Sequence, residues 1–275
     1  MIKMTYTDME TECRFAHEEV KVSNFPDNTL LLKTKDVDFY KPINIEWYYE
    51  NDAELFTIIC LAKKALSKKT LFMPYCPHAR QDRIKSEEDT FTLKYFAETI
   101  NSLGFDKVTI LDPHSNVCTA LIDRVVVETP ELYIDEVITD VIDRNRHTDV
   151  VLFFPDEGSM KRYSDMSELP YAFGLKKRDW KTGQIQGLDI VDNGIDLKDK
   201  TILIIDDISS RGGTFYHSAK ALKELGVGNI YLYVTHCENT ILEGEVLTSG
   251  LIRRVYTTNS IFTKEHEDIT VMKLH

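Results

Sequence analysis

Apolar runs alternate with amphipathic stretches along most of this chain. The run Ile202–Ile205 is uniformly apolar, as expected for a strand that is buried on both faces of a sheet. The stretch 90–103 places Phe91, Tyr95, Phe96 and Ile100 near helical spacing, and Gly104 follows as a residue that commonly ends helices. Because buried strands alternate with amphipathic helices, the pattern predicts βα units and a mainly parallel sheet.

The same pattern locates the elements of the two halves. It predicts strands at Ile43–Tyr48, Thr70–Tyr75, Lys107–Leu111, Val150–Phe154, Tyr171–Leu175, Thr201–Ile205, Asn229–Thr235 and Arg253–Thr257. It predicts helices at Asp52–Leu66, Thr90–Leu103, Leu132–Arg144, Gly213–Leu225 and Glu238–Thr248. The polar segment Lys176–Gly194 is predicted to form a hairpin or mobile flap, a usual place for a lid over a reaction centre.

The plan repeats in two halves that meet near Thr129-Pro130, with no low-complexity linker between them. A length of 275 residues allows one large domain or two ordinary ones. We therefore expect an α/β protein with two domains, residues 1–130 and residues 131–275, each with a mainly parallel sheet flanked by helices.

Composition excludes several classes of protein. The net charge of −12 makes a nucleic-acid partner an unfavourable interpretation, so cations that bind phosphates must be concentrated locally. No apolar window reaches the roughly 18 residues needed to span a bilayer, and the N-terminus lacks an apolar signal segment. Both observations favour a cytoplasmic protein with no membrane partner. The odd number of scattered cysteines favours reduced thiols over a disulfide framework: Cys13, Cys60, Cys76, Cys118 and Cys237.

The strongest chemical signal follows the strand at 201–205. Two carboxylates, Asp206 and Asp207, are followed by Gly212-Gly213-Thr214 and a predicted helix. Ligands of open α/β sheets bind outside the carboxyl ends of strands, and a helix N-terminus after glycines attracts anions. The acids suit hydroxyl groups and the glycine turn suits a phosphate, which together favour a phosphorylated sugar. A helix N-cap followed by a plain turn is the structural alternative.

Two further strand ends in the first half carry polar clusters. Arg80, Gln81, Asp82 and Arg83 suit a nucleotide, because guanidinium groups pair with phosphate oxygens. The alternative is a solvated loop with a local Arg–Asp pair. His114 follows Asp112 at the end of another strand, where it could share a divalent cation or serve as a hydrogen-bonded structural residue.

The second half carries two more such clusters. Asp156 follows a strand and precedes a glycine and a helix, so it is a candidate metal ligand or an N-cap. Lys176-Lys177-Arg178 opens the predicted flap and suits contacts to phosphate in a transition state. A solvated charged face is the alternative.

In this order, the segments resemble the ribose-phosphate pyrophosphokinase family, also called phosphoribosyl pyrophosphate synthetases, from about Phe25 to Ser260. The Asp206–Thr214 segment by itself resembles the ribose-phosphate loop of type I phosphoribosyltransferases. The resemblance implies two phosphoribosyltransferase-like α/β domains, a homo-oligomer, ATP as co-substrate and Mg²⁺.

The resemblance also assigns residues. It implies ATP binding by Arg80, Gln81, Asp82, Arg83 and His114, and by Phe25 and Asp27 of a neighbouring subunit's Phe-Pro-Asp loop. It implies a metal site at His114 and Asp156 and catalytic roles for Lys176 and Arg178. It implies ribose binding by Asp206 and Asp207 and phosphate binding by Ser210, Arg211, Gly212, Gly213 and Thr214.

The chain departs from the family pattern at four places. Asn28-Thr29 replaces Gly-Glu after the Phe-Pro-Asp loop, and the chain before Phe25 is expected to lack the first βα unit. Ser210-Arg211 replaces Asp-Thr, which makes the phosphate loop more positive by about two charges at neutral pH. The short segment after Ile261 leaves open whether the regulatory ADP site of the family exists.

The expected reaction transfers the β,γ-diphosphoryl group of ATP to the anomeric hydroxyl of ribose 5-phosphate, giving phosphoribosyl pyrophosphate and AMP. Arg211 keeps a 5-extended ribose such as ADP-ribose open as the acceptor. Two other classes also stay open: a non-catalytic regulatory relative that binds phosphorylated ribose, and a phosphoribosyltransferase that consumes the activated sugar. Neither the oligomer size nor the group that deprotonates the acceptor follows from the sequence.

Overall fold

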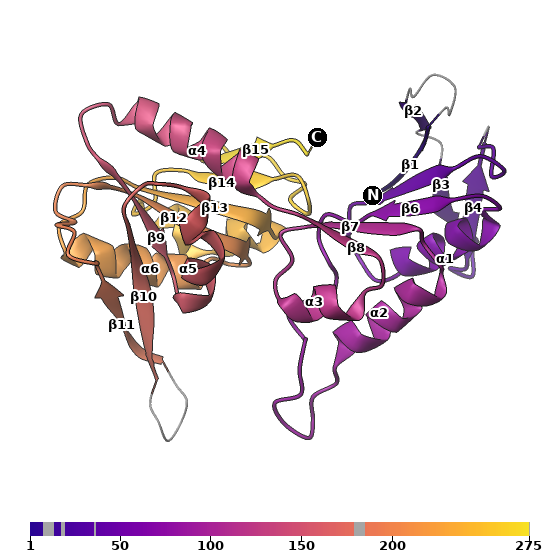
Figure 1. Cartoon of the computed structure of the whole chain (residues 1–275), viewed down its shortest axis with the longest axis horizontal. Helices are drawn as coiled ribbons and strands as arrows, with labels where there is room; N and C mark the ends of the chain where they lie inside the picture. The colour runs from indigo at the N-terminus through magenta and orange to yellow at the C-terminus, as the bar shows by residue number, and fades with distance from the viewer. Residues whose placement is uncertain (8–13, 18–19, 36, 179–184, 275) are drawn as a thin grey trace. The chain divides into compact units, whose positions relative to one another are not determined.

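The computed structural model describes residues 1–7, 14–17, 20–35, 37–178 and 185–274 (Figure 1). It divides the chain into two compact units, Met1–Thr129 and Pro130–His275, where the sequence predicted a boundary after residue 130. None of the described helices is long and apolar enough to cross a membrane.

The first unit is built on a six-stranded sheet in the order β2-β1-β5-β6-β7-β8. Its strands β5 to β8 are parallel, and β1 pairs antiparallel to β5. A separate antiparallel hairpin holds β3 and β4. The strands are β1 (Ile2–Thr7), β2 (Arg14–His17), β3 (Val20–Asn24), β4 (Leu30–Thr34), β5 (Ile43–Trp47), β6 (Lys69–Phe72), β7 (Lys107–Leu111) and β8 (Val125–Glu128).

Three helices of the first unit lie on one side of this sheet (Figure 1): α1 (Glu54–Lys64), α2 (Thr92–Ser102) and α3 (Asn116–Leu121). One hydrophobic core joins them to the sheet, with Ile58 of α1, Phe96 of α2 and Ile45 of β5 buried in it. Of the apolar residues that the helical spacing put on one face, Phe96 and Ile100 are buried and Phe91 packs against this core, whereas Tyr95 is 57% exposed.

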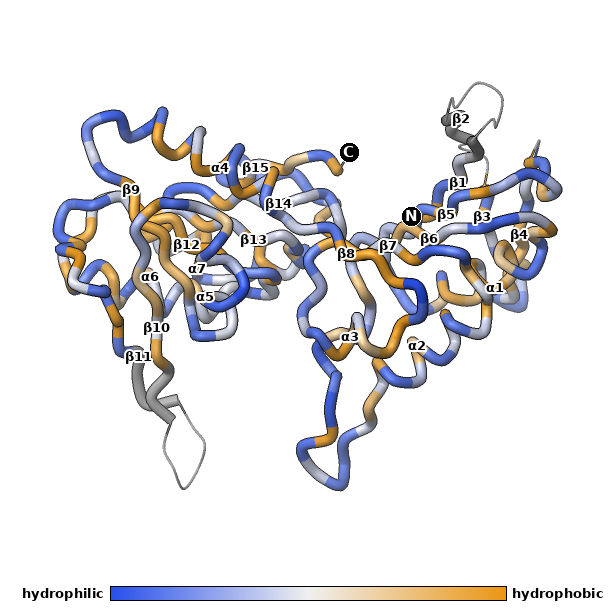
Figure 2. Tube along the Cα trace, in the orientation of Figure 1, coloured by the Kyte–Doolittle hydropathy of each residue, from blue (hydrophilic) through white to orange (hydrophobic). Residues whose placement is uncertain are grey.

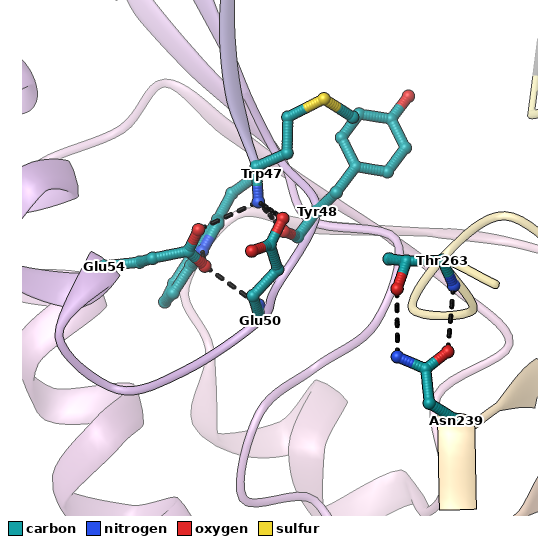
Figure 3. A network of polar contacts seen from close by, with 7 residues as sticks. Trp47, Tyr48, Glu50, Glu54, Asn239 and Thr263 are labelled. Carbon is teal, nitrogen blue, oxygen red and sulfur yellow. Dashed lines mark hydrogen bonds and ion pairs between the residues drawn. The ribbon is translucent and has the colours of Figure 1, made fainter. Parts of the chain in front are cut away.

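The turn after β5 is closed by a carboxylate (Figure 3). Glu54 accepts hydrogen bonds from Trp47 Nε1 and from the backbone N–H of Glu50, both at 2.9 Å. Because Trp47 is buried and carries one N–H donor, this bond satisfies a group whose burial would otherwise be costly. The bond fixes the start of α1 against the end of β5.

The second unit is built on a seven-stranded sheet in the order β11-β10-β9-β12-β13-β14-β15. All neighbouring pairs are parallel except β10 and β11, which form an antiparallel hairpin. The strands are β9 (Val150–Phe154), β10 (Tyr171–Arg178), β11 (Ile185–Val191), β12 (Thr201–Ser209), β13 (Ile230–Cys237), β14 (Val255–Thr258) and β15 (Ile269–Met272).

Both faces of this sheet are covered. Alternate residues of β9 enter two cores: Val151 and Phe153 pack with α6, and Leu152 and Phe154 pack with α4. The helical elements are α4 (Glu131–Arg144), α5 (Glu157–Tyr163), α6 (Gly213–Glu224), α7 (Glu245–Thr248) and the 3₁₀ turns η1 (Ser164–Met166) and η2 (Asn239–Glu243). The uniformly apolar strands of the sequence are therefore the strands that are covered on both faces, and the predicted α/β fold is confirmed.

Several expectations need correction. The pattern predicted no strands before Phe25, where the structure has β1, β2 and β3. The expected lack of a first βα unit stays a prediction. The pattern also missed the short β4, β8 and β15, and the helix α3. The strand predicted to end at Ile205 continues to Ser209, because Ile208 and Ser209 still pair with β13.

Candidate functional site

The loop between β12 and α6 is shaped by one glycine. Gly212 has φ 76°, a left-handed conformation, and stands at the N-cap of α6. A Cβ atom on Gly212 would lie 2.7 Å from Cγ1 of Val246, so the position lacks room for a side chain as well. The free N–H groups of the first turn of α6 therefore lie directly after the turn, an arrangement that binds anions.

A carboxylate pair precedes this turn, within the last residues of β12. Asp207 is buried, Asp206 is partly buried, and the backbone N–H of Asp207 donates to Oδ1 of Asp206 at 3.0 Å. Burial, and then the negative charges of Asp207 and Asp156, raise the pKa of Asp206 well above its usual value. Arg162 on α5 places Nη1 3.5 Å from Oδ2 of Asp207. The pair is thus concentrated negative charge that a hydroxyl-rich or cationic ligand would relieve.

Asp156 caps α5. Its Oδ1 accepts the backbone N–H groups of Gly158 at 3.0 Å and Ser159 at 3.1 Å, and the Ser159 hydroxyl completes a capping box. The structural alternative considered for Asp156 is therefore present. Its contribution to the pKa of Asp206 also places its charge near the carboxylate pair. Capping and metal binding are compatible in one carboxylate, which has about four lone-pair positions.

The candidate phosphate loop, residues 210–214, packs against the segment 239–248. A Cβ atom on Gly244 would lie only 1.8 Å from the carbonyl oxygen of Arg211, so the two backbones are in direct contact. Gly244 has φ −97° and ψ 154°, which interrupts the helix expected over Glu238–Thr248 and leaves η2 and α7 on either side. The prediction of one continuous helix is wrong, because close packing against the loop requires an extended glycine at this point.

Side chains strengthen this contact. Glu243 Oε2 pairs with Nη2 of Arg211 at 2.9 Å, and both side chains are exposed. The hydroxyls of Ser210 and Thr240 lie 3.3 Å apart. At the first residue of η2, the Asn239 amide and Thr263 exchange two hydrogen bonds of 2.9 and 3.0 Å (Figure 3). The conformation of residues 210–212 is therefore supported from outside the loop.

In the first unit, the loop after β6 meets the loop after β7. Asp82 is buried and holds Arg83 through two hydrogen bonds, Nε to Oδ1 at 2.7 Å and Nη2 to Oδ2 at 3.1 Å. The bond from Arg83 is the main cause that holds the pKa of Asp82 below its usual value, with further lowering by Ser115 and by the charge of His114. The local Arg–Asp pair considered for this loop is present, and His114 lies beside it.

Of the other residues of this loop, one has a structural hydrogen bond and one has an exposed side chain. Gln81 accepts a hydrogen bond from the Thr92 hydroxyl at 2.8 Å and so anchors the loop to the first residue of α2. Arg80 is exposed. Arg80 and Arg83 thus carry guanidinium groups on a loop that Gln81 anchors to α2, and Asp82 orients the guanidinium of Arg83.

The Phe-Pro-Asp segment forms the tip of the β3–β4 hairpin. Asp27 Oδ1 accepts the backbone N–H of Thr29 at 3.0 Å and its hydroxyl at 2.7 Å. The hydroxyl is the main cause that lowers the pKa of Asp27. Phe25 is 48% exposed at this turn. The turn therefore presents a half-exposed aromatic ring.

The flap prediction is confirmed as a hairpin in the described residues. Lys176 pairs with Leu188 across β10 and β11, and Arg178 pairs with Ile185 after a register shift at Lys177/Arg178. The part of the predicted flap at residues 179–184 lies outside the described residues. The two candidate catalytic residues thus stand at the end of a strand that neighbours β9.

Comparison with known proteins decides the family. A curated ribose-phosphate pyrophosphokinase of Clostridium perfringens is 30% identical over 233 residues, which cover 81% of this chain and 70% of the relative. The chain belongs to the ribose-phosphate pyrophosphokinase family. The enzyme of that name from Campylobacter jejuni is 27% identical over 208 residues, 74% of this chain.

The chain spans 62% to 65% of the length of several of these pyrophosphokinases, including that of C. jejuni. A crystal structure of phosphoribosylpyrophosphate synthetase from Mycobacterium smegmatis aligns with a TM-score of 0.73 and 20% identity, covering 92% of this chain and 85% of that one. That likeness confirms the fold. No family model matches the chain.

Sequence reasoning did not single out the residues that support the site. Arg162 lies on α5, after the candidate Asp156. Its position beside Asp207 depends on the pairing of β9 with β12. Gly244 offered a signal, because a glycine inside a predicted helix is unfavourable and often has a packing reason. Glu243 and Thr240 offered none, since their contacts lie about 30 residues from the loop that they touch.

Proposed function

We propose that this chain catalyses diphosphoryl transfer from ATP to the anomeric hydroxyl of ribose 5-phosphate. The observation that carries the proposal is the order of Asp206, Asp207, the left-handed Gly212 and the N-terminus of α6 at the end of β12. Family membership supports it. We further propose that the protein is cytoplasmic and forms homo-oligomers.

The proposed acceptor binds through the second unit. Asp206 and Asp207 would accept hydrogen bonds from the ribose 2- and 3-hydroxyls, and the N–H groups at 210–214 would bind the 5-phosphate. A ribose hydroxyl that donates to Asp206 stabilises its charged form, which burial and neighbouring carboxylates disfavour in the ligand-free protein. Ligand binding and relief of this electrostatic cost are therefore coupled.

The proposed donor binds through the first unit, with Arg80, Gln81, Asp82, Arg83 and His114 toward ATP. Phe25 and Asp27 would reach the adenine of a neighbouring subunit. Asp82 holds the Arg83 guanidinium in a fixed orientation, which lowers the entropy lost when that group binds phosphate.

The residues proposed to contact a metal ion suit Mg²⁺ that arrives bound to ATP. Among the described residues no group of three or more His, Cys, Asp or Glu side chains is placed to hold a metal ion. Mg²⁺ is usually bound by one or two carboxylates, by waters and by substrate phosphates. In the proposal, Asp156 would supply a carboxylate, and His114 would contact a water bound to the ion. Bound there, the ion would neutralise charge on the phosphate oxygens.

In the proposed step, the anomeric oxygen attacks the β-phosphorus and the bond from that phosphorus to the α,β-bridging oxygen breaks. AMP leaves with the bridging oxygen, and the hydroxyl proton is released. Positioning and charge neutralisation dominate such transfers, and Lys176 and Arg178 would supply cations to the migrating group and the leaving oxygen.

A second acceptor is favoured by one observation. Arg211 replaces an uncharged position of the family loop, and its side chain is 71% exposed beside the turn. A guanidinium there suits the second phosphate of a 5-diphosphate such as that of ADP-ribose.

The test is mass spectrometry of the products formed from Mg-ATP with ribose 5-phosphate, ADP-ribose and unphosphorylated ribose. AMP together with a diphosphorylated sugar supports the proposal and identifies the acceptor. Release of no AMP with any acceptor overturns it and leaves a non-catalytic ribose-phosphate-binding relative. Consumption of phosphoribosyl pyrophosphate by an added nucleobase, without AMP formation from ATP, identifies a phosphoribosyltransferase.

A further inference from the structure

Two buried thiols of the first unit lie close to bonding distance from each other. The Sγ atoms of Cys76 and Cys118 are 2.7 Å apart, although the two residues are 42 positions apart in the chain. Both side chains are buried in the core of this unit. The spacing of the cysteines in the sequence favours reduced thiols, and both residues are reduced in the structure. The fold alone brings these two thiols together.

The contact joins two segments that follow neighbouring parallel strands. Cys76 lies in the loop after β6, and Cys118 is the third residue of α3, which follows β7. A backbone bond already links these segments: the N–H of Leu111 donates to the carbonyl oxygen of Pro74 at 3.1 Å. Figure 2 shows that α3 is largely hydrophobic, whereas the outer part of the loop between β6 and α2 is largely hydrophilic. The thiols therefore lie at the apolar base of a loop whose outer part is polar.

The geometry of the pair suits a disulfide. The sulfur atoms of a disulfide are about 2.05 Å apart, so the bond requires that the two Sγ atoms approach by less than about 1 Å. The thiol of Cys118 donates to Sγ of Cys76, and the thiol of Cys76 donates toward the carbonyl oxygen of Pro77 at 3.6 Å. Both side chains are thus oriented by hydrogen bonds before any reaction occurs.

Burial determines how this pair reacts. Burial raises the pKa of Cys76 well above its usual value, and the neighbouring Cys118 raises it further, so the resting thiols are neutral and weakly nucleophilic. The first oxidation step is therefore slow and requires a small oxidant. The second step is fast, because the partner sulfur is already in place. A sulfur that has been oxidised once is therefore captured as a disulfide before it is oxidised further.

We propose that Cys76 and Cys118 form a reversible disulfide when the protein is exposed to a peroxide. Sγ of Cys76 attacks one oxygen of hydrogen peroxide, the O–O bond breaks, and the departing hydroxide takes the thiol proton and leaves as water. Sγ of Cys118 then attacks Sγ of Cys76, the S–O bond of the sulfenic acid breaks, and a second water leaves with the proton of Cys118. The two sulfurs lose two electrons to the peroxide, and a dithiol such as dithiothreitol reverses the oxidation.

The disulfide would link the loop between β6 and α2 covalently to α3. The enclosed segment contains the candidate residues Arg80–Arg83 and His114. A link across so many residues constrains the unfolded chain more than the folded one, so the oxidised protein should be more stable than the reduced protein. The proposal concerns this modification and is independent of the proposed function.

Peptide mapping tests the pairing. The protein is treated with a small excess of hydrogen peroxide, its remaining thiols are alkylated under denaturing conditions, and it is cleaved with trypsin. We expect peptides 70–80 and 108–124 to be recovered joined, at a mass lower by two hydrogen atoms than the sum of the reduced peptides. Dithiothreitol should separate them. Without peroxide, both peptides should be recovered separately in alkylated form.

Two variants and a melting experiment complete the test. Cys60 is partly exposed on α1 and lies outside the pair, so Cys60→Ser should still give the joined peptides. Cys118→Ala removes the partner thiol and should give no joined peptide, and circular dichroism checks that this variant is folded. The oxidised wild type should melt about 5–10 °C above the reduced protein, a rise that Cys118→Ala should lack.

Three results would overturn the proposal. The first is recovery of both peptides separately and alkylated after prolonged treatment that oxidises Cys60. The second is a disulfide that joins Cys76 to a cysteine other than Cys118. The third is a joined form that melts no higher than the reduced protein. None of these measurements uses catalysis, so failure of the proposed disulfide and failure of the proposed function are distinguishable.

Discussion

Gly244 supports the backbone of Arg211 from outside the loop that Arg211 belongs to. A β-carbon at Gly244 would come within 1.8 Å of the Arg211 carbonyl oxygen, a distance that real side chains do not tolerate. The segment after β13 thus defines the position of the turn after β12. We expect changes in the supporting segment to act on ligand binding at the turn.

Gly244→Ala should displace the turn at residues 210–212. Overpacking of this kind costs about 1–3 kcal/mol, and we expect a lower melting temperature together with a KM for ribose 5-phosphate raised about tenfold. Differential scanning fluorimetry and AMP release measure the two effects. Glu245→Ala, an exposed neighbour, is the matched control. An unchanged KM in Gly244→Ala would show that the turn does not depend on this contact.

Asp206→Asn should make the protein more stable and less active. The raised pKa of Asp206 means that the free energy of unfolding falls as the pH rises from about 3.9 toward the folded-state value. At neutral pH, without Mg²⁺ and ligands, the asparagine variant lacks this cost and should melt at a higher temperature. We expect its turnover to fall about a hundredfold if the carboxylate orients the ribose.

The comparison is thermal unfolding at pH 7 in the presence of a chelator, beside AMP release with Mg-ATP. A variant that melts lower than the wild type at pH 7 would contradict the electrostatic cost assigned to Asp206. The same pair of measurements on Asp123→Asn, an exposed substitution, controls for the general effect of removing a charge.

Asp82→Asn should destabilise the first unit in a pH-dependent way. The lowered pKa of Asp82 means that its pairing with Arg83 contributes stability above the unfolded-state value of about 3.9 and loses it as the pH falls through the folded-state value. Loss of a hydrogen bond to a charged group costs about 1.5–3 kcal/mol, a value that the exposure of Arg83 reduces. Urea unfolding at pH 7 should show the difference, and unfolding at successively more acidic pH should show it diminish.

Arg211→Ala should have little effect on stability. Both side chains of its ion pair with Glu243 are exposed, and such pairs contribute between about 0 and 1 kcal/mol to the free energy of unfolding. If Arg211 selects a 5-diphosphate, the ratio of kcat/KM for ADP-ribose to that for ribose 5-phosphate should fall by about tenfold or more. An unchanged ratio would remove Arg211 from acceptor selection. Glu243→Gln, which leaves Arg211 in place, should change the ratio in the opposite direction or not at all.

Lys176→Ala should lower kcat by about 10²–10³ and leave the KM for ATP within a few-fold, because a cation that acts in the transition state contributes little to ground-state binding. Single-turnover AMP formation measures the chemical step directly. A rise in KM at constant kcat would assign Lys176 to substrate binding alone.

Much of the fold followed from local pattern. Val150–Phe154 was predicted with the bounds that the structure has, because a strand covered on both faces is uniformly apolar and needs no partner to be recognised. The short edge strands were missed for the opposite reason. Val125–Glu128 is half exposed, and its four residues carry no period that distinguishes a strand from a loop.

The features of the candidate site likewise fall into those set by local sequence and those set by tertiary contacts. The sequence by itself determined that Asp206 and Asp207 lie toward the carboxyl end of a buried strand, and that glycines then begin a helix, because each of these features depends on neighbours in the chain. Only the tertiary structure decided that Gly244 supports Arg211, that Arg162 lies beside Asp207 and that Asp156 adds its charge to the pair. Those relationships join residues from about 30 to 50 positions apart, and their distances depend on how strands pair and helices pack, which no local pattern records.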